Sequence, residues 1–148
     1  MREDIQALIC RNNHCVLATA VGNRPHCSLM SYTADQQGRE LYMITLRNTQ
    51  KFENLLLNPQ VSVLIDTREQ DIGSRRGRVK AVTVSGVFQA ITDQGKKDAV
   101  RAQLATAHPH LQELAARAEA EPFSIIVESV LLLDGVTEAY FEEVNQGS

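Results

Sequence analysis

Long apolar segments are missing from this sequence. No purely apolar run is longer than the four residues Val130–Leu133, whereas a helix that spans a bilayer needs about 20. The N-terminal residues MREDIQALICRNN carry charges of both signs and no extended apolar core, so we expect no secretory signal. These shortages predict a protein with no membrane partner.

The sequence also lacks a strong excess of positive or negative charge, and it lacks an even set of cysteines. The net charge is −3 over 148 residues, without a run of five like charges, whereas nucleic-acid-binding surfaces are basic. We therefore expect no nucleic-acid partner. The three cysteines, Cys10, Cys15 and Cys27, are an odd number, which is typical of a reducing compartment when no signal peptide is present. The sequence thus predicts a cytoplasmic protein.

Several well-known catalytic and metal-binding patterns are absent. The sequence has no G-x-G-x-x-G, P-loop, G-x-S-x-G or C-x2-C pattern. The pairs His14-Cys15 and His26-Cys27 are poor metal ligands, because adjacent residues on a strand point to opposite faces. We predict no metal site, and no side chain is identified as a catalytic acid or base.

The apolar patterns that are present predict a single domain over residues 1–148, mainly β with a few helices (α+β). Hydrophobic residues make up 43% of the chain and charged residues 22%, which suits a folded core. Several antiparallel strands with few helices suggest a small closed barrel with helices outside. Gly86 is a candidate bulge or close-approach point. The expected strands are 14–21, 25–32, 40–46, 61–67, 79–91, 123–133 and 139–144, and the expected helices are 2–12, a short one after Thr49, and 93–120, divided at His108-Pro109.

The stretch TLRNTQKFENLLLNP, which begins at Thr45, places a cation at the start of a short helix. Thr49 can cap this helix, or its hydroxyl can turn to an external anion. Lys51 in the first turn opposes the helix dipole at a cost of roughly 0.3–1 kcal/mol, and a bound phosphate would remove that conflict. The alternative is an ordinary capped helix with a solvated lysine. An apolar stripe of Phe52, Leu55 and Leu56 should hold the helix down.

The order of these segments resembles a known family. PHCSLMSY, the strand ELYMIT, the pattern T-x-K-x3-L-x2-N-P, and VTVSGVFQAI together are similar to the FMN-binding split barrels related to pyridoxamine 5′-phosphate oxidase. The resemblance is good over about residues 8–91 and looser beyond. It implies an antiparallel split β-barrel of Greek-key type with flanking helices, an FMN cofactor at the interface of a homodimer, and a small-molecule substrate that remains unknown.

The resemblance also implies a set of cofactor-binding residues. Thr49 and Lys51 match the residues that hold the FMN phosphate, and Thr45 matches a strand-end residue near the same cofactor. Ser28, Leu29 and Met30 match the strand whose main chain lies along the isoalloxazine ring. A contribution from the partner chain would fall at residues 80–82.

The sequence departs from the oxidases themselves. Cys27 and Tyr32 stand where those enzymes have basic residues, and Gln50 replaces an arginine. No tryptophan occurs up to Ser148, so the Trp- and Arg-rich tail that grips the vitamer phosphate has no counterpart. These departures leave FMN binding supported and oxidation of pyridoxine phosphate unsupported, so we predict a flavin-dependent oxidoreductase with another substrate, which is unknown. The alternatives are a non-catalytic flavin carrier or sensor, and a relative that uses F420 or haem.

Three smaller features have two interpretations each. His108-Pro109-His110 is interpreted as a helix junction with two surface histidines, with haem ligation as the alternative. Cys15 and Cys27 are interpreted as small buried strand residues, with a reactive Cys27 thiol near the flavin as the alternative. The loop from Gln70 to Arg78, which carries Arg75, Arg76 and Arg78, is either solvated or an electropositive rim for an anionic ligand.

Overall fold

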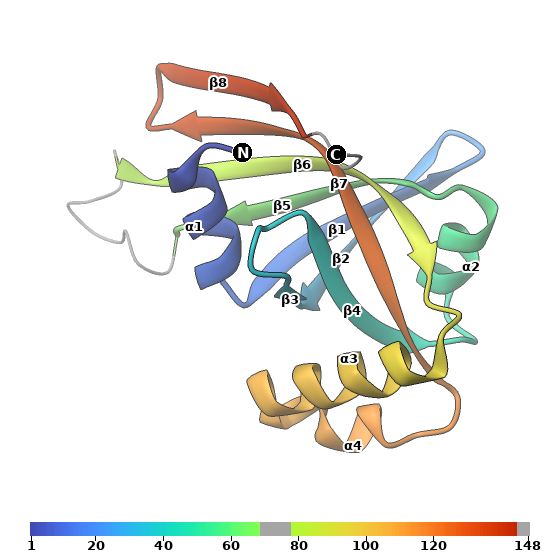
Figure 1. The fold of residues 1–148 in the computed structure, drawn as a ribbon. Helices are drawn as coiled ribbons and strands as arrows, with labels where there is room; N and C mark the ends of the chain where they lie inside the picture. Colours follow the sequence, from blue (N-terminus) through green and yellow to red (C-terminus); the bar gives the residue numbers. More distant parts are fainter. Residues whose placement is uncertain (69–77, 145–148) are drawn as a thin grey trace.

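A computed structural model describes residues 1–68 and 78–144 as one curled, antiparallel β-sheet with flanking helices (Figure 1). Among the described residues the strand order is β2-β1-β5-β6-β7-β4-β3, and β8 pairs with the second half of β7, on the same edge of β7 as β4. The predicted split β-barrel class is confirmed. The strands are β1 His14–Val21, β2 Arg24–Ser31, β3 Thr33–Ala34, β4 Glu40–Leu46, β5 Gln60–Asp66, β6 Lys80–Ala90, β7 Ala120–Asp134 and β8 Glu138–Glu143.

The described helices lie outside the sheet (Figure 1). None of them is long and apolar enough to cross a membrane. The predicted helical region 93–120 does divide at His108, but it ends earlier than expected, because β7 already begins at Ala120. The helices are α1 Glu3–Arg11, α2 Gln50–Leu57, α3 Gln94–Ala107, the short 3-10 helix η2 Pro109–Leu111 and α4 Gln112–Ala115.

Among the described strands no pairing joins β2 to β3 to close the barrel, which corrects the closed barrel expected from the sequence. Within the described ranges β2 and β3 are the two edges of the sheet. The chain passes from one edge to the other through Tyr32, whose side chain is buried. The Tyr32 hydroxyl donates to the Ile9 carbonyl at 2.5 Å, and its amide donates to the Asn13 carbonyl at 3.0 Å. Tyr32 therefore anchors the segment between β2 and β3 to α1 and to the residue before β1.

The long strand β7 joins the parts of the sheet. Its first half pairs with β4, its second half pairs with β8, and it pairs with β6 on its other side. The register of β6 shifts between Ser85 and Gly86, as expected for a bulge. A Cβ at Gly86 would lie 2.7 Å from the Ile126 carbonyl oxygen, so this close approach requires glycine.

Two separate apolar clusters stabilise the molecule. The larger fills the inside of the curled sheet and includes Ile5, Leu8 and Ile9 from α1. The smaller lies where α3 and α4 cover β4 and the start of β7, below the barrel in Figure 1. Val100 and Leu104 of α3 belong to this second cluster. The two helices at this end are thus held by their own core.

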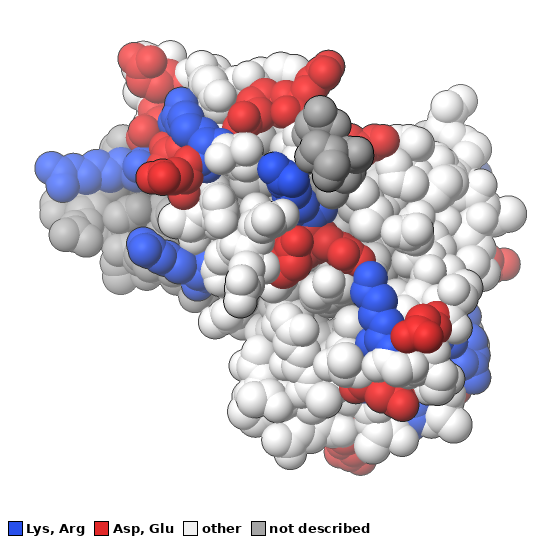
Figure 2. Space-filling view, in the orientation of Figure 1, with Lys and Arg blue, Asp and Glu red and all other residues white. Residues whose placement is uncertain are grey.

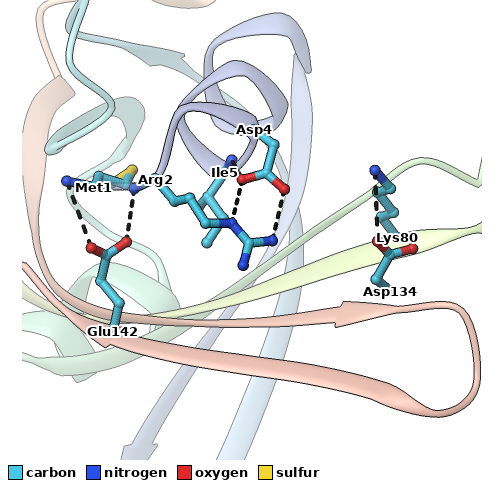
Figure 3. A network of polar contacts seen from close by, with 7 residues as sticks. All are labelled: Met1, Arg2, Asp4, Ile5, Lys80, Asp134 and Glu142. Atoms are coloured by element: carbon cyan, nitrogen blue, oxygen red, sulfur yellow. Dashed lines mark hydrogen bonds and ion pairs between the residues drawn. The ribbon is translucent and has the colours of Figure 1, made fainter.

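Polar contacts tie the start of α1 to β8 (Figure 3). The Arg2 amide donates to Glu142 Oε1 at 2.9 Å, and the N-terminal ammonium lies 3.8 Å from Glu142 Oε2. The Arg2 guanidinium hydrogen-bonds Asp4, which lowers the pKa of that carboxyl, and it lies over the Tyr140 ring. Figure 2 shows acidic side chains along β8, whereas charged side chains are sparse over α2 and the β1–β2 hairpin.

Candidate functional site

A pocket of about 450 Å³ opens between β2, β4, the start of α2 and the segment from η2 to α4. Its size lies within the range of about 300–1,000 Å³ that is typical of small-molecule sites. Five of the six predicted cofactor-binding residues line it, and Ser28 is the exception. The lining residues are His14, Leu29, Met30, Ser31, Ile44, Thr45, Leu46, Thr49, Lys51, His110, Leu111 and Leu114.

Thr49 caps the helix that forms one wall of this pocket. Its hydroxyl accepts from the Phe52 amide at 3.3 Å and donates to the Leu46 carbonyl at 2.9 Å. The hydroxyl therefore satisfies one of the amides that a helix start leaves unpaired. The same bonds fix α2 directly behind the end of β4, where Thr45 is 5% exposed.

The orientation of α2 differs from the predicted apolar stripe. Phe52 and Leu55 are buried as expected, but Leu56 is 61% exposed, and Asn54 is buried in its place. The Asn54 amide donates to the Thr19 hydroxyl at 3.2 Å, and the Asn58 amide donates to the Ala20 carbonyl at 2.8 Å. These two polar anchors to β1 decide which face of α2 is buried, because a buried amide without a partner is costly.

Lys51 is the cation of the α2 wall. Its side chain is half-buried, and Nζ lies 3.2 Å from the sulfur of Met30. Burial lowers the pKa of this ammonium. In the part of the chain that the structure describes, no carboxylate lies within ion-pair distance of Lys51, whereas Lys80, Lys96 and Lys97 each pair with one. An anionic ligand in the pocket would compensate this charge.

Strand β2 forms the opposite wall as an edge strand. Among the described strands it pairs only with β1, so its other edge presents unpaired backbone groups. The side chains alternate: Leu29 is 76% exposed, Met30 is 5% exposed, and Ser28 is half-buried. This edge suits contact with a planar ring through its main chain.

The two positions where the oxidases carry basic residues face different surroundings. Tyr32 is buried, and burial raises the pKa of its hydroxyl, so this side chain is held inside the protein. Cys27 is exposed, which corrects the expected burial, whereas Cys15 is buried and its pKa is raised to about 12. Cys27 lies on β2, which has β1 as its only neighbour among the described strands.

His14 and His110 line the remaining wall of the pocket, and the buried His108 packs against both of them. The sequence alone did not bring these three histidines together. One ring nitrogen from each of His14, His108 and His110 lies within 4.8 Å of the others. His108 is 3% exposed, so the expectation of two surface histidines is wrong for this residue, which caps the end of α3 and turns inward. No local pattern joins residue 14 to residues 108 and 110, because only the fold makes them neighbours.

In the loop that was predicted to be solvated or to form an electropositive rim, Arg75 and Arg76 lie outside the described residues. Arg78 is exposed. Lys80, in the segment suggested for a partner's contribution, lies 3.8 Å from Asp134 of the neighbouring strand (Figure 3).

Comparison with known proteins agrees with this fold. A family model described as pyridoxamine 5′-phosphate oxidase matches residues 1–132. The chain belongs to this family. No curated protein matches it in sequence.

Solved structures share the fold of this pyridoxamine 5′-phosphate oxidase family member at low identity. A haem-binding protein from Mycobacterium smegmatis has a TM-score of 0.82 at 18% identity, covering 95% of this chain, which spans 57% of that protein. An FAD-binding protein from Mesorhizobium loti has a TM-score of 0.72 at 22% identity, covering 87% of this chain and 89% of that one. The haem storage protein HutZ from Vibrio cholerae has a TM-score of 0.72 at 20% identity, covering 91% and 96%.

Proposed function

We propose that this pyridoxamine 5′-phosphate oxidase family member binds FMN and acts as a flavin-dependent oxidoreductase on a small molecule. The observation that carries the proposal is Lys51, a half-buried ammonium on the pocket wall with a thioether contact and no carboxylate partner among the described residues. A terminal phosphate supplies the missing charge and forms charge-assisted hydrogen bonds.

The residues around Lys51 fit the rest of such a cofactor. Thr45 and the capped start of α2 lie beside the proposed phosphate site, and the free edge of β2 at Leu29 and Met30 offers main-chain groups to the ring. When bound, the flavin supplies the hydride or electron transfer, while the protein provides binding and orientation. Lys51 holds the anionic end, and the exposed Leu29 covers apolar ring surface.

Titration of flavin-free protein tests this proposal. FMN should bind more tightly than riboflavin, because only FMN carries the phosphate that Lys51 would pair with. FAD tests whether the site requires a terminal phosphate. Equal affinity for FMN and riboflavin would contradict the phosphate site. Turnover with a reductant would separate an oxidoreductase from a carrier or sensor that holds its flavin without reaction.

We also propose that the chain forms a homodimer with the flavin at its interface. An apolar row crosses the outer face of the sheet, because Leu29 pairs with Val16, Val16 with Leu64, and the row continues through Thr83 and Leu131 to Phe141. Residues directly opposite each other on paired strands share a face. Leu29 and Phe141 are 76% and 60% exposed, and Leu64 and Leu131 are each 37% exposed. Apart from the half-buried Thr83 the row is apolar, and an exposed apolar surface of this kind is typical of an interface. The row begins at Leu29 on the pocket wall, which suits a site that the partner chain completes.

Light scattering tests the dimer. The wild type should have twice the 16.4 kDa chain mass. Leu64→Glu places a charge in the middle of the row and should shift the chain toward the monomer and weaken FMN binding. Val136→Glu is the matched control, because Val136 is 94% exposed in the β7–β8 turn. A stable wild-type monomer that still binds FMN would contradict the proposal.

Haem is a second candidate ligand, because imidazoles of His14 and His110 line the same pocket and imidazole is a common haem ligand. The absorption spectrum of freshly purified protein separates the candidates. Oxidised flavin bands support the first proposal, and a Soret band that His110→Ala removes supports the second.

We place the protein in the cytoplasm. The support is that Cys10, Cys15 and Cys27 are all free, as expected in a reducing compartment. Finding the chain in cytosolic fractions checks this placement.

A further inference from the structure

Three of the four histidines in the sequence lie together at one end of the pocket. The ring centroids of His14 and His110 are 6.3 Å apart with nearly parallel planes, and the His108 ring stands edge-on to both at 5.7 and 5.6 Å. A ligand nitrogen from each ring lies within 4.8 Å of the others. We propose that His14, His108 and His110 bind a divalent transition-metal ion such as Zn²⁺.

His108 is held ready for coordination. Its Nε2 lies 2.8 Å from the Tyr32 carbonyl oxygen, which can only accept, so Nε2 carries the proton. A neutral ring then has its lone pair on Nδ1, which is the atom that would bind the metal. Metal-ligating histidines usually donate their other N–H to a carbonyl or carboxylate in this way. The ring is 3% exposed, so its orientation is fixed by packing as well.

Ser31 provides a comparable support for His110. The Ser31 hydroxyl lies 3.1 Å from His110 Nε2. Ser31 is also the residue directly opposite His14 across the β1–β2 pair, so both side chains lie on the same face of the hairpin. The His14 side chain has no hydrogen-bond partner among the described residues, although its ring contacts both other histidines. The bonds of His110 and His108 leave a nitrogen on each ring available.

The geometry needs only a small adjustment to hold a metal ion. Zn–N bonds of about 2.0–2.1 Å in a tetrahedral site place the nitrogens about 3.3 Å apart. His14 and His110 are both exposed, so they can rotate inward to shorten separations of up to 4.8 Å by the roughly 1.5 Å that this requires. Three imidazoles satisfy the ligand preference of Zn²⁺ and leave a fourth position for water or a ligand. That position would face the pocket that His14 and His110 line together with Lys51.

A structural interpretation explains less of the cluster. A core histidine satisfied by the Tyr32 carbonyl would account for His108 alone. It gives no reason for two exposed imidazoles from β1 and η2 to lie against it with their nitrogens converging.

Metal titration of the full chain, stripped by a chelator and free of flavin, tests the proposal. Calorimetry with Zn²⁺ and the visible spectrum with Co²⁺ should report one ion per chain in a tetrahedral nitrogen environment. His14→Ala and His110→Ala each remove a ligand from an exposed position, so both variants should fold and lose at least tenfold in affinity. His26→Ala is the matched control, because His26 is exposed on β2 outside the cluster, and its affinity should equal that of the wild type.

Several results would overturn the site. They are an absence of saturable binding in the wild type, an equal loss in His26→Ala, or a wild-type affinity retained in both His14→Ala and His110→Ala. Uptake of haem with no binding of Zn²⁺ would also overturn it and would assign the imidazoles to haem. The metal titration uses flavin-free protein, so its result does not depend on whether the proposal of FMN binding is correct. Lys51→Ala should retain the metal affinity of the wild type.

Discussion

Two of the walls of the pocket, the α2 wall and the histidine wall, suit different kinds of ligand atom. The α2 wall carries one cation, Lys51, held in place by a helix that Thr49 caps and that Asn54 anchors to β1. The opposite end carries three imidazoles, which offer lone pairs rather than a fixed charge. One wall therefore suits an anion, whereas the other suits an electron-pair acceptor. A ligand that carries a phosphate would engage the first wall without requiring the second.

The walls also differ in how they are assembled. Every part of the α2 wall except its anchors to β1 comes from one continuous stretch, Thr45–Pro59, so helix start signals describe it. The histidine wall joins the beginning of β1 to a 3-10 turn near residue 110, with the end of β2 as the connection through Ser31 and Tyr32. Single substitutions can therefore test the role of each wall without changing the other.

Lys51→Ala should have the largest effect and should act on one wall only. Loss of a charge-assisted hydrogen bond costs roughly 1.5–3 kcal/mol, so FMN affinity should fall by about ten- to a hundredfold. Riboflavin affinity should hardly change, and fluorescence titration with both flavins measures the difference. Lys97→Ala is the control, because Lys97 already pairs with Glu121. An equal loss for both flavins would mean that the fold, not the phosphate site, was disturbed.

Tyr32→Phe should lower the free energy of unfolding of the protein. Tyr32 lies beside the histidine wall, because its carbonyl contacts His108. The substitution leaves the buried Ile9 carbonyl without the hydroxyl that donates to it, and an unsatisfied buried group costs about 1–3 kcal/mol. Urea unfolding should show a free energy of unfolding lower by that amount. Tyr140→Phe should change it little, because the described contact of Tyr140 is made by its ring with Arg2. Unchanged unfolding in Tyr32→Phe would mean that this bond does not stabilise the gap between β2 and β3.

Ser31→Ala should have a smaller effect, again on the histidine wall. Removing the hydroxyl that lies against His110 should lower Zn²⁺ affinity about tenfold, as is usual for residues that orient a ligand. Ser85→Ala, at an exposed position of β6, serves as the control. Calorimetry at constant buffer composition measures both variants. Identical affinities would show that Ser31 does not orient the ring.

The smallest effect concerns pH and the ligand-free protein. Burial lowers the pKa of Lys51 below its ordinary value of 10.5, so the unfolded chain binds more protons than the folded chain in the alkaline window below that value. Stability contributed by this residue should therefore rise with pH through that window and be lost as pH falls. Lys51→Met should remove the rise. Comparing unfolding curves of the two proteins between neutral and alkaline pH isolates this small difference from the other titrating groups.

Much of the fold could be predicted because its signals are local. Turn residues after Val21 define the first hairpin, and Pro109 divides the helical region, as the structure confirms. The exposure of Leu56 and Cys27 could not be predicted from periodicity. Leu56 is exposed because two asparagines set the rotation of α2, and Cys27 is exposed because β2 is an edge strand.

The candidate site was predicted unevenly for the same reason. Thr45, Thr49 and Lys51 come from one stretch, and the structure gathers them on one pocket with Leu29 and Met30. The histidines could not be joined by spacing, since His14 and His110 meet only after β2 and α3 have packed. Their assembly depends on tertiary structure that no short motif encodes.

The shared strand β7 has a consequence for how the chain folds. Apart from the two residues of β3, the described pairing of β4 is with the first half of β7, about eighty positions later in the chain. Pairings of such long range are slow to form, because loop-closure entropy opposes them before any contact is gained. On the ribosome, β4 must therefore emerge with one edge bare and wait for Ala120–Ile126. During that interval the nascent chain is most exposed to strand-to-strand association with another copy, and a chaperone that shields β4 would have the greatest effect on its yield.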